Sequence, residues 1–176
     1  RDWSSDVCSS DLLVLNATNL TWSSQGAAVV DGVLFSNLAV TSTAGSVTVN
    51  RTGAYNVTSA SGVGSVSLSG DAGITLTGNV TSTGTVAINS AGGAVTVDRT
   101  IDPNATISGT VLTVNSTGDT RLFTNVTSLA GRIAGGNLDV TEANGLAIDA
   151  GHLNVAGNVT INVGSASTAG SLTVAG

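Results

Sequence analysis

Residues 78–88 read Gly-Asn-Val-Thr-Ser-Thr-Gly-Thr-Val-Ala-Ile, and this stretch contains the pattern that decides the fold. Its second half is a five-residue unit: a small residue, any residue, an apolar residue, a polar residue (here Ala87 instead) and another apolar residue. Alternation of this kind, with a period of two, is typical of a β-strand that has one buried face. The stretch therefore predicts a short strand that buries Val86 and Ile88.

The same unit recurs along the chain at 45–49, 64–68, 84–88, 93–97, 136–140, 151–155, 157–161 and 170–174, with shorter variants at 73–76 and 145–148. Equivalent apolar residues are 19 to 21 positions apart, in the pairs Val47–Val66, Val66–Val86, Ile74–Val95, Leu138–Val159 and Leu153–Leu172. A recurrence of about 20 residues, with two or three short strands in each interval, is what one coil of a parallel β-helix requires. We therefore expect an all-β solenoid with coils of about 20 residues and almost no helix.

The composition of the chain agrees with stacked coils. Charged residues make up only 9% of the chain, while Ser and Thr together supply 47 residues. Stacked Thr side chains are favourable on a pleated surface, whereas stacked like charges repel one another. A hydrophobic content of 41% is too high for intrinsic disorder, which usually combines low hydrophobicity with high charge.

The first twelve residues, RDWSSDVCSSDL, share neither the composition nor the rhythm of the remainder. The string resembles a translated sequencing-adapter fragment, so we expect residues 1–12 to be an artefactual segment foreign to the natural protein. The only cysteine, Cys8, lies in this segment, and its removal would exclude a disulfide scaffold, a zinc ribbon or a thiol enzyme. Residues 13–176 are then predicted to be a single β-solenoid fragment, truncated at both ends.

The charge and hydropathy of the chain argue against two classes of partner. The net charge is −6, and every basic residue is one of five Arg, with no basic stripe to meet phosphates. Nucleic acid is therefore not an expected partner. No apolar run approaches the roughly 20 residues of a membrane-spanning helix, so we expect no membrane insertion of this segment.

The rhythm loosens at two places, Asp98–Asn104, which contains the only proline, and Thr117–Arg132. Both are expected to be longer corners or loops that project from one face of the solenoid.

Candidate catalytic and metal-binding residues are few. His152 has no second His or Cys to complete a metal site, and we expect it to be an outward polar residue. Asp98 and Asp102 form the densest carboxylate group, as a paired-carboxylate mechanism would need, but they lie just before Pro103 in a turn-like segment, where Asp commonly caps turns. Gly70-Asp71 and Gly118-Asp119 are too isolated for calcium-binding nonapeptide repeats. We predict no catalytic residue, no cofactor and no metal site.

Asn-x-Ser/Thr is the one over-represented short motif, and it occurs at Asn16, Asn19, Asn50, Asn56, Asn79, Asn104, Asn115, Asn125 and Asn158. The seven from Asn50 onwards are candidate glycosylation sites. The alternative is that the motif recurs because a turn Asn leads into an apolar-then-polar strand.

Runs such as 78–88 and Gly-Asn-Val-Thr-Ile-Asn-Val at 157–163 resemble the repeats of filamentous-haemagglutinin-type adhesins and autotransporter passengers, over about residues 45–176. The resemblance implies a right-handed parallel β-helix that is secreted or displayed on the outer surface of a bacterium. It also implies attachment to a host or environmental surface through a glycan or protein receptor. We therefore predict a structural or adhesive repeat segment of a large surface protein or exoprotein, and not an enzyme.

Two other functions remain open at the level of sequence. The first is a fragment of a carbohydrate-active β-helix enzyme, with Asp98 or Asp102 in the reaction. The second is an ice- or surface-binding solenoid, suggested by the Thr-x-Thr pairs at Thr41/Thr43, Thr75/Thr77, Thr81/Thr83 and Thr83/Thr85.

Overall fold

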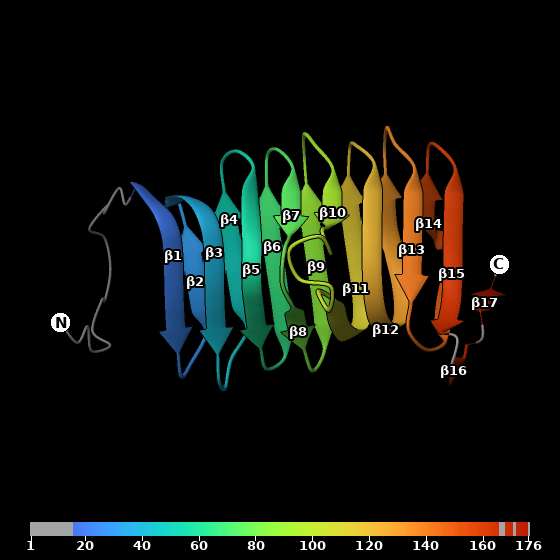
Figure 1. Cartoon of the computed structure of the whole chain (residues 1–176), viewed down its shortest axis with the longest axis horizontal. Coiled ribbons are helices and arrows are strands. Elements are labelled where there is room, and N and C mark those ends of the chain that lie inside the picture. Colours follow the sequence, from blue (N-terminus) through green and yellow to red (C-terminus); the bar gives the residue numbers. More distant parts are fainter. Residues whose placement is uncertain (1–15, 166–167, 171, 176) are drawn as a thin grey trace.

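The computed structural model describes residues 16–165, 168–170 and 172–175, and in these ranges strands follow one another with only turns and one longer loop between them. They form an all-β solenoid of about eight turns, with coils of about 19 residues and no helix (Figure 1). The predicted segment 1–12 lies outside the described residues. The strands are β1 (Asn16–Ser24), β2 (Ala28–Asp31), β3 (Leu34–Ser42), β4 (Val47–Arg51), β5 (Tyr55–Gly62), β6 (Ser65–Gly70), β7 (Ile74–Leu76), β8 (Val80–Ser82), β9 (Thr85–Ser90), β10 (Val95–Val97), β11 (Ile107–Ser116), β12 (Thr120–Ile133), β13 (Leu138–Glu142), β14 (Leu146–Val155), β15 (Val159–Ser165), β16 (Thr168–Ala169) and β17 (Leu172–Ala175).

Each strand pairs in parallel with its equivalent one coil away, so the wall of the solenoid consists of stacked columns; the short β16, antiparallel to β15, is the exception. We name three columns by their inward residues. The first column stacks Tyr55, Ile74, Val95, Thr120, Leu138 and Val159. The second column stacks Val40, Ala60, Val80, Ile107, Thr124 and Glu142. The third column stacks Ala28, Val47, Val66, Val86, Leu112, Leu129 and Ile148.

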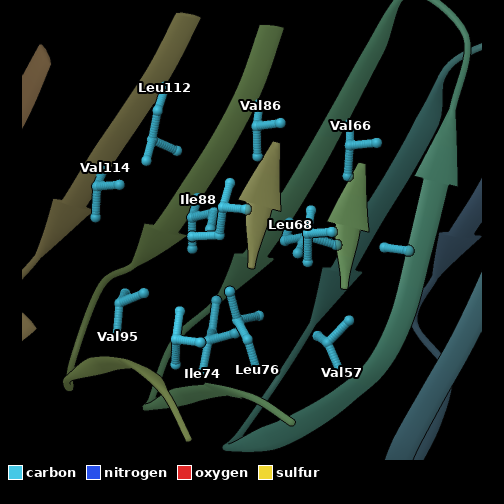
Figure 2. Packing of buried hydrophobic residues seen from close by; sticks show 14 of the residues in the cluster. Val57, Val66, Leu68, Ile74, Leu76, Val86, Ile88, Val95, Leu112 and Val114 are labelled. Carbon is cyan, nitrogen blue, oxygen red and sulfur yellow. The ribbon is translucent and has the colours of Figure 1, made fainter. Parts of the chain in front are cut away.

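The core is the space that these columns enclose. Figure 2 shows Val66, Leu68, Val86 and Ile88 from the third-column strands pointing into the same interior as Ile74 and Leu76 from β7. All six side chains are essentially buried. Alternate residues of each strand point outward and are mostly Ser, Thr, Asn or Asp, as in β6, where exposure alternates along the strand. Burying a side chain of this size contributes roughly 1.5–3 kcal/mol, so the apolar columns supply the main stabilising free energy.

The coil spacing predicted from the sequence is confirmed for four of the five residue pairs. Val47 stacks on Val66, Val66 on Val86, Ile74 on Val95 and Leu138 on Val159. The fifth pair is wrong, because Leu172 stacks on Leu146 and not on Leu153. β14 is a long strand with two apolar units, and a β-bulge between Leu129 and Gly131 on its neighbour shifts the register at that point.

Of the two regions that the sequence predicts to be corners or loops, one forms a loop and the other is mostly a strand. Residues 98–106 form a loop between β10 and β11, as expected for Asp98–Asn104. The loop lengthens its coil, so that Val86 stacks on Leu112, which lies further along the chain than the regular spacing would place its partner. The expectation for Thr117–Arg132 is wrong, because only its first residues form a corner and the rest belongs to β12, the longest described strand. Leu112 stacks directly on Leu129 although the two are closer in sequence than the regular spacing, so this coil is short and lacks a projecting loop.

Glycine serves two purposes in the coils. Gly64 sits at a corner with a φ of +103°, a conformation that residues with a Cβ rarely adopt. Gly78 has no such φ, but a Cβ at this position would lie 1.9 Å from the carbonyl oxygen of Thr58 in the next coil. Stacking therefore demands glycine at positions where turn geometry alone does not.

Candidate functional site

A shallow concave surface lies at the corner that follows the third column. At or next to its last residue, each strand of this column carries an outward polar residue that stacks from coil to coil, and these residues are Asp31, Asn50, Ser69, Asn89, Asn115 and Arg132. We call this row the corner ladder. Five steps of about 4.8 Å separate its ends, so the row is roughly 24 Å long and runs along the solenoid axis.

Two shallow cavities lie along the corner ladder. One has a volume of about 310 Å³ and is lined by the ladder from Asp31 to Asn89, together with Arg51 and Asp71. The other, of about 220 Å³, continues from Asn89 to Arg132. Asn89 and Ala91 line both cavities, so the two lie end to end along the ladder, and we call them together the corner groove.

Small residues lie beside the middle of the ladder. The position after the ladder residue stacks Arg51, Gly70, Ser90, Ser116 and Ile133 on successive coils, and it is small at the three central ones. Ser90 turns its hydroxyl inward and donates to the carbonyl of Ala72 at 2.5 Å, so it adds no bulk to the surface. Ala91 and Ala134 line the cavities at the corner itself.

The amides of the corner ladder differ from those of the other asparagine ladder. On the first-column face, Asn37 Nδ2 donates to Asn19 Oδ1 at 2.8 Å, and Asn56 Nδ2 donates to Asn37 Oδ1 at 3.0 Å. In the groove, Asn115 Oδ1 accepts the backbone N–H of Arg132 at 3.1 Å. Among the contacts of the described residues, the exposed side chains of Asn50 and Asn89 make no hydrogen bond with the protein. Both residues line the cavities along the ladder.

Charges in the groove offset one another. Asp31 and Asp71 line it together with Arg51 and Arg132. Arg51 is largely engaged, because its Nη1 donates to the carbonyls of Thr52 (2.9 Å) and Ala54 (2.6 Å). Asp71 accepts the backbone N–H of Gly53. The site is therefore polar and close to neutral, without the single-sign field that recruits a highly charged ligand.

An aromatic cluster supports the wall beneath Arg51. The rings of Phe35 and Tyr55 meet edge to face with centroids 5.5 Å apart, and Arg51 Cζ lies 5.2 Å from the Phe35 centroid. Both rings are buried. Burial raises the pKa of the Tyr55 phenol well above its ordinary value of 10.0, and nearby Arg51 lowers it by a smaller amount. No aromatic side chain lines the groove.

The loop at 98–106 places Asp98 and Asp102 in turns. Asp98 Oδ1 accepts the hydroxyl of Thr100 at 2.7 Å and its backbone N–H at 2.9 Å. These bonds, the side-chain one foremost, lower the pKa of Asp98. Asp102 Oδ1 accepts the backbone N–H of Asn104 at 2.9 Å. Each carboxylate thus closes its own turn.

Arg99 holds the same loop against the neighbouring coil, which contains Phe123. Its guanidinium carbon lies 4.0 Å from the centroid of the Phe123 ring. Arg99 Nε donates to the carbonyl of Ala105 at 2.9 Å, and Nη2 donates to the hydroxyl of Thr106 at 3.0 Å. The loop is therefore held against the wall and presents Ile101, which is 70% exposed.

The nine Asn-x-Ser/Thr sites occupy several kinds of position. Asn79 and Asn158 directly precede strands, as the turn interpretation requires. Asn19, Asn56 and Asn125 lie inside strands, and Asn125 accepts a hydrogen bond from Asn144 Nδ2 at 2.5 Å. Asn50 and Asn115 belong to the corner ladder and Asn104 to the loop, while Asn16 begins β1. Glycosylation of these sites stays a prediction.

Other candidate residues are dispersed. His152 lies exposed within β14, as expected. Among the described residues, no group of three His, Cys, Asp or Glu is placed to hold a metal ion. Thr77 is buried, and Thr75 stacks on Thr96, whereas Thr81 stacks on Ser61 and Ser108. The Thr-x-Thr pairs thus do not stack on one another as a single array.

Comparison with protein-family models, curated proteins and solved structures finds no match for this chain. The fold and the groove define the class of protein as a parallel β-solenoid with a polar corner groove. In the part of the chain that is described, no helix is long and apolar enough to cross a membrane. The corner ladder leaves a signal in the sequence that was not recognised above: a polar residue directly follows the last apolar residue of many strands, as in Val49-Asn50, Ile88-Asn89 and Val114-Asn115.

Proposed function

We propose that the chain is a structural and adhesive repeat segment of a large bacterial protein that is secreted or displayed on the outer cell surface. The observation that carries the proposal is the continuous stack of apolar columns, which makes the described residues an elongated rod. Because neighbouring coils hydrogen-bond along the whole wall, such a rod keeps its length and presents its faces at fixed spacing. A spacer or an adhesive stalk needs these two properties.

The composition supports the same proposal. Outward positions are mostly small and uncharged, and the chain as a whole has 9% charged residues. A surface of this kind resists nonspecific binding to polyanions and leaves recognition to hydrogen bonds and shape. The resemblance to filamentous-haemagglutinin and autotransporter repeats points in the same direction.

That the chain catalyses no reaction is part of the proposal. Support comes from Asp98 and Asp102, the densest carboxylate pair, because each accepts the backbone N–H of a residue two positions later. A carboxylate that closes its own turn is poorly placed to share a substrate bond with the other.

Adhesion can be tested with beads that carry the purified chain at one end. We expect the beads to be retained under flow on a polysaccharide film, a protein film or intact cells, well above albumin-coated beads. Retention at the albumin level on every surface would remove the adhesive half of the proposal. The structural half is tested separately by small-angle scattering, where a compact globule instead of a rod would contradict it.

A further inference from the structure

The corner groove is the feature that the proposed function leaves unexplained. A rod that served only as a spacer would need no concave surface, and the other asparagine ladder shows how stacked amides can satisfy one another. Asn50 and Asn89 instead line the groove, beside a ladder about 24 Å long, and make no side-chain hydrogen bond with the protein. Amide groups arranged in this way can exchange their bound water for the hydroxyl groups of a ligand.

We propose that the corner groove binds a straight, neutral polysaccharide chain that runs along the solenoid axis. This inference rests on the proposed adhesive function and names the ligand class. One sugar unit of an extended β-linked chain is similar in length to one coil step, so successive units would meet successive members of the corner ladder. Hydroxyl groups are both donors and acceptors, and they match the mixed capacity of the asparagine amide.

The charge and surface chemistry of the groove exclude some classes of ligand. Asp31 and Asp71 offset Arg51 and Arg132, so a uronate polymer would gain no net attraction. The groove lacks the exposed apolar anchor that a protein hot spot normally fills. With no aromatic platform for the sugar face, each contact is weak, and affinity depends on how many coils the ligand covers.

Asn89 is the residue to change in the test, because it lines both cavities of the groove. Asn89→Leu removes its amide, and Ala91→Leu fills the groove at the same point without touching an amide. Both positions are exposed, so both variants should fold. Asn104→Leu is the matched control, since Asn104 is an exposed asparagine on the loop between the first and second columns, away from the groove.

The probes are soluble oligosaccharides of straight β-linked glucan, mannan and xylan, with a flexible dextran and an oligogalacturonate of equal length for comparison. Calorimetry on the intact chain should show binding of at least one straight neutral oligomer, with affinity rising as sugars are added until the groove is full. Asn89→Leu and Ala91→Leu should each weaken binding fivefold or more, and Asn104→Leu should not change it. Circular dichroism and melting temperature verify that each variant is folded.

Three results would overturn the inference: no binding of any straight neutral oligomer, stronger binding of the oligogalacturonate, or equal binding by Asn89→Leu and Ala91→Leu and the unmodified chain. The bead assay separates these failures from that of the proposed function. Beads that are retained equally with and without Asn89→Leu would keep the adhesive function and reject the groove as its site.

Discussion

The backbone N–H of Val126 donates to both carboxylate oxygens of Glu142, at 3.3 Å to Oε1 and 3.2 Å to Oε2. Glu142 is fully buried and occupies an inward position of the second column, between Thr124 and Val163. Its Oε1 also accepts the backbone N–H of Asn144 at 3.1 Å. One side chain thus accepts hydrogen bonds from two backbone amide groups, which belong to two successive coils.

This arrangement predicts that Glu142→Ala destabilises the solenoid. A buried N–H left without an acceptor typically costs about 1–3 kcal/mol, and the N–H of the buried Val126 loses its acceptor here. Glu142→Gln keeps one acceptor oxygen and should lose less. Urea denaturation of the three proteins measures the difference, and equal midpoints for Glu142→Ala and the unmodified chain would contradict the role given to Glu142.

Tyr55 is the only tyrosine of the chain, so its titration can be followed without interference. Its pKa is raised in the folded state, chiefly by burial. The stability contributed by the neutral phenol is therefore fully present below its ordinary pKa of 10.0 and declines as the pH rises above it. Tyrosinate absorbance should appear only together with the loss of the β-sheet circular dichroism. Ionisation near the ordinary pKa in a chain that is still folded would show that the phenol is accessible.

Gly131 and Gly32 form a matched pair for the stacking argument. Both have a positive φ, of +137° and +67°, so an added Cβ strains the backbone at either position. At Gly32 nothing lies within 4 Å of that Cβ, whereas at Gly131 it would be 1.9 Å from the carbonyl oxygen of Val114. We expect Gly32→Ala to cost about 1 kcal/mol, as left-handed strain does. Gly131→Ala should lower the thermal midpoint clearly more, and equal shifts would remove the steric explanation.

The Arg99–Phe123 contact predicts how the loop is held. Arg99→Ala removes a cation–π interaction worth about 0.5–2 kcal/mol and two hydrogen bonds, all within the loop and the wall beneath it. Hydrogen exchange and proteolysis should increase across 98–106, while the exchange of β4 and β6 should not change. Faster exchange throughout the rod would mean that the loop is a part of the folding core.

Asp98 should make the same loop sensitive to acid. Its pKa is lowered below the ordinary value of 3.8 by the Thr100 hydroxyl first and the Thr100 backbone second. The turn is therefore fully stabilised above pH 3.8 and loses this contribution as the pH falls through the lower pKa of the folded state. Loop exchange in the unmodified chain should rise at low pH towards that of Asp98→Ala. If Asp98→Ala exchanges no faster at neutral pH, the carboxylate does not order the turn.

Substitution of Leu68 measures how much the apolar core contributes to the stability of the chain. It is fully buried and stacks between Val49 and Ile88. Leu68→Ala should destabilise the chain by about 2–5 kcal/mol, because neighbouring coils cannot close the cavity without breaking their own register. Val63→Ala provides the control, since Val63 is 46% exposed at a corner and should have little effect on the denaturation midpoint.

The sequence by itself determined the class of fold, many of the short strands and most of the stacking. Alternating apolar residues that recur at a nearly constant spacing admit few other packings, and Val47, Val66 and Val86 stack as that spacing predicts. Only the tertiary structure decided where the period changes. Val86 stacks on Leu112 across an inserted loop, and the next coil, from Leu112 to Leu129, is shorter than the regular spacing. The groove also depends on this change of period, because Asn89 and Asn115 become neighbours only when their coils stack. Hydrogen bonding between the coils fixes that register, and no local preference of the chain could have fixed it.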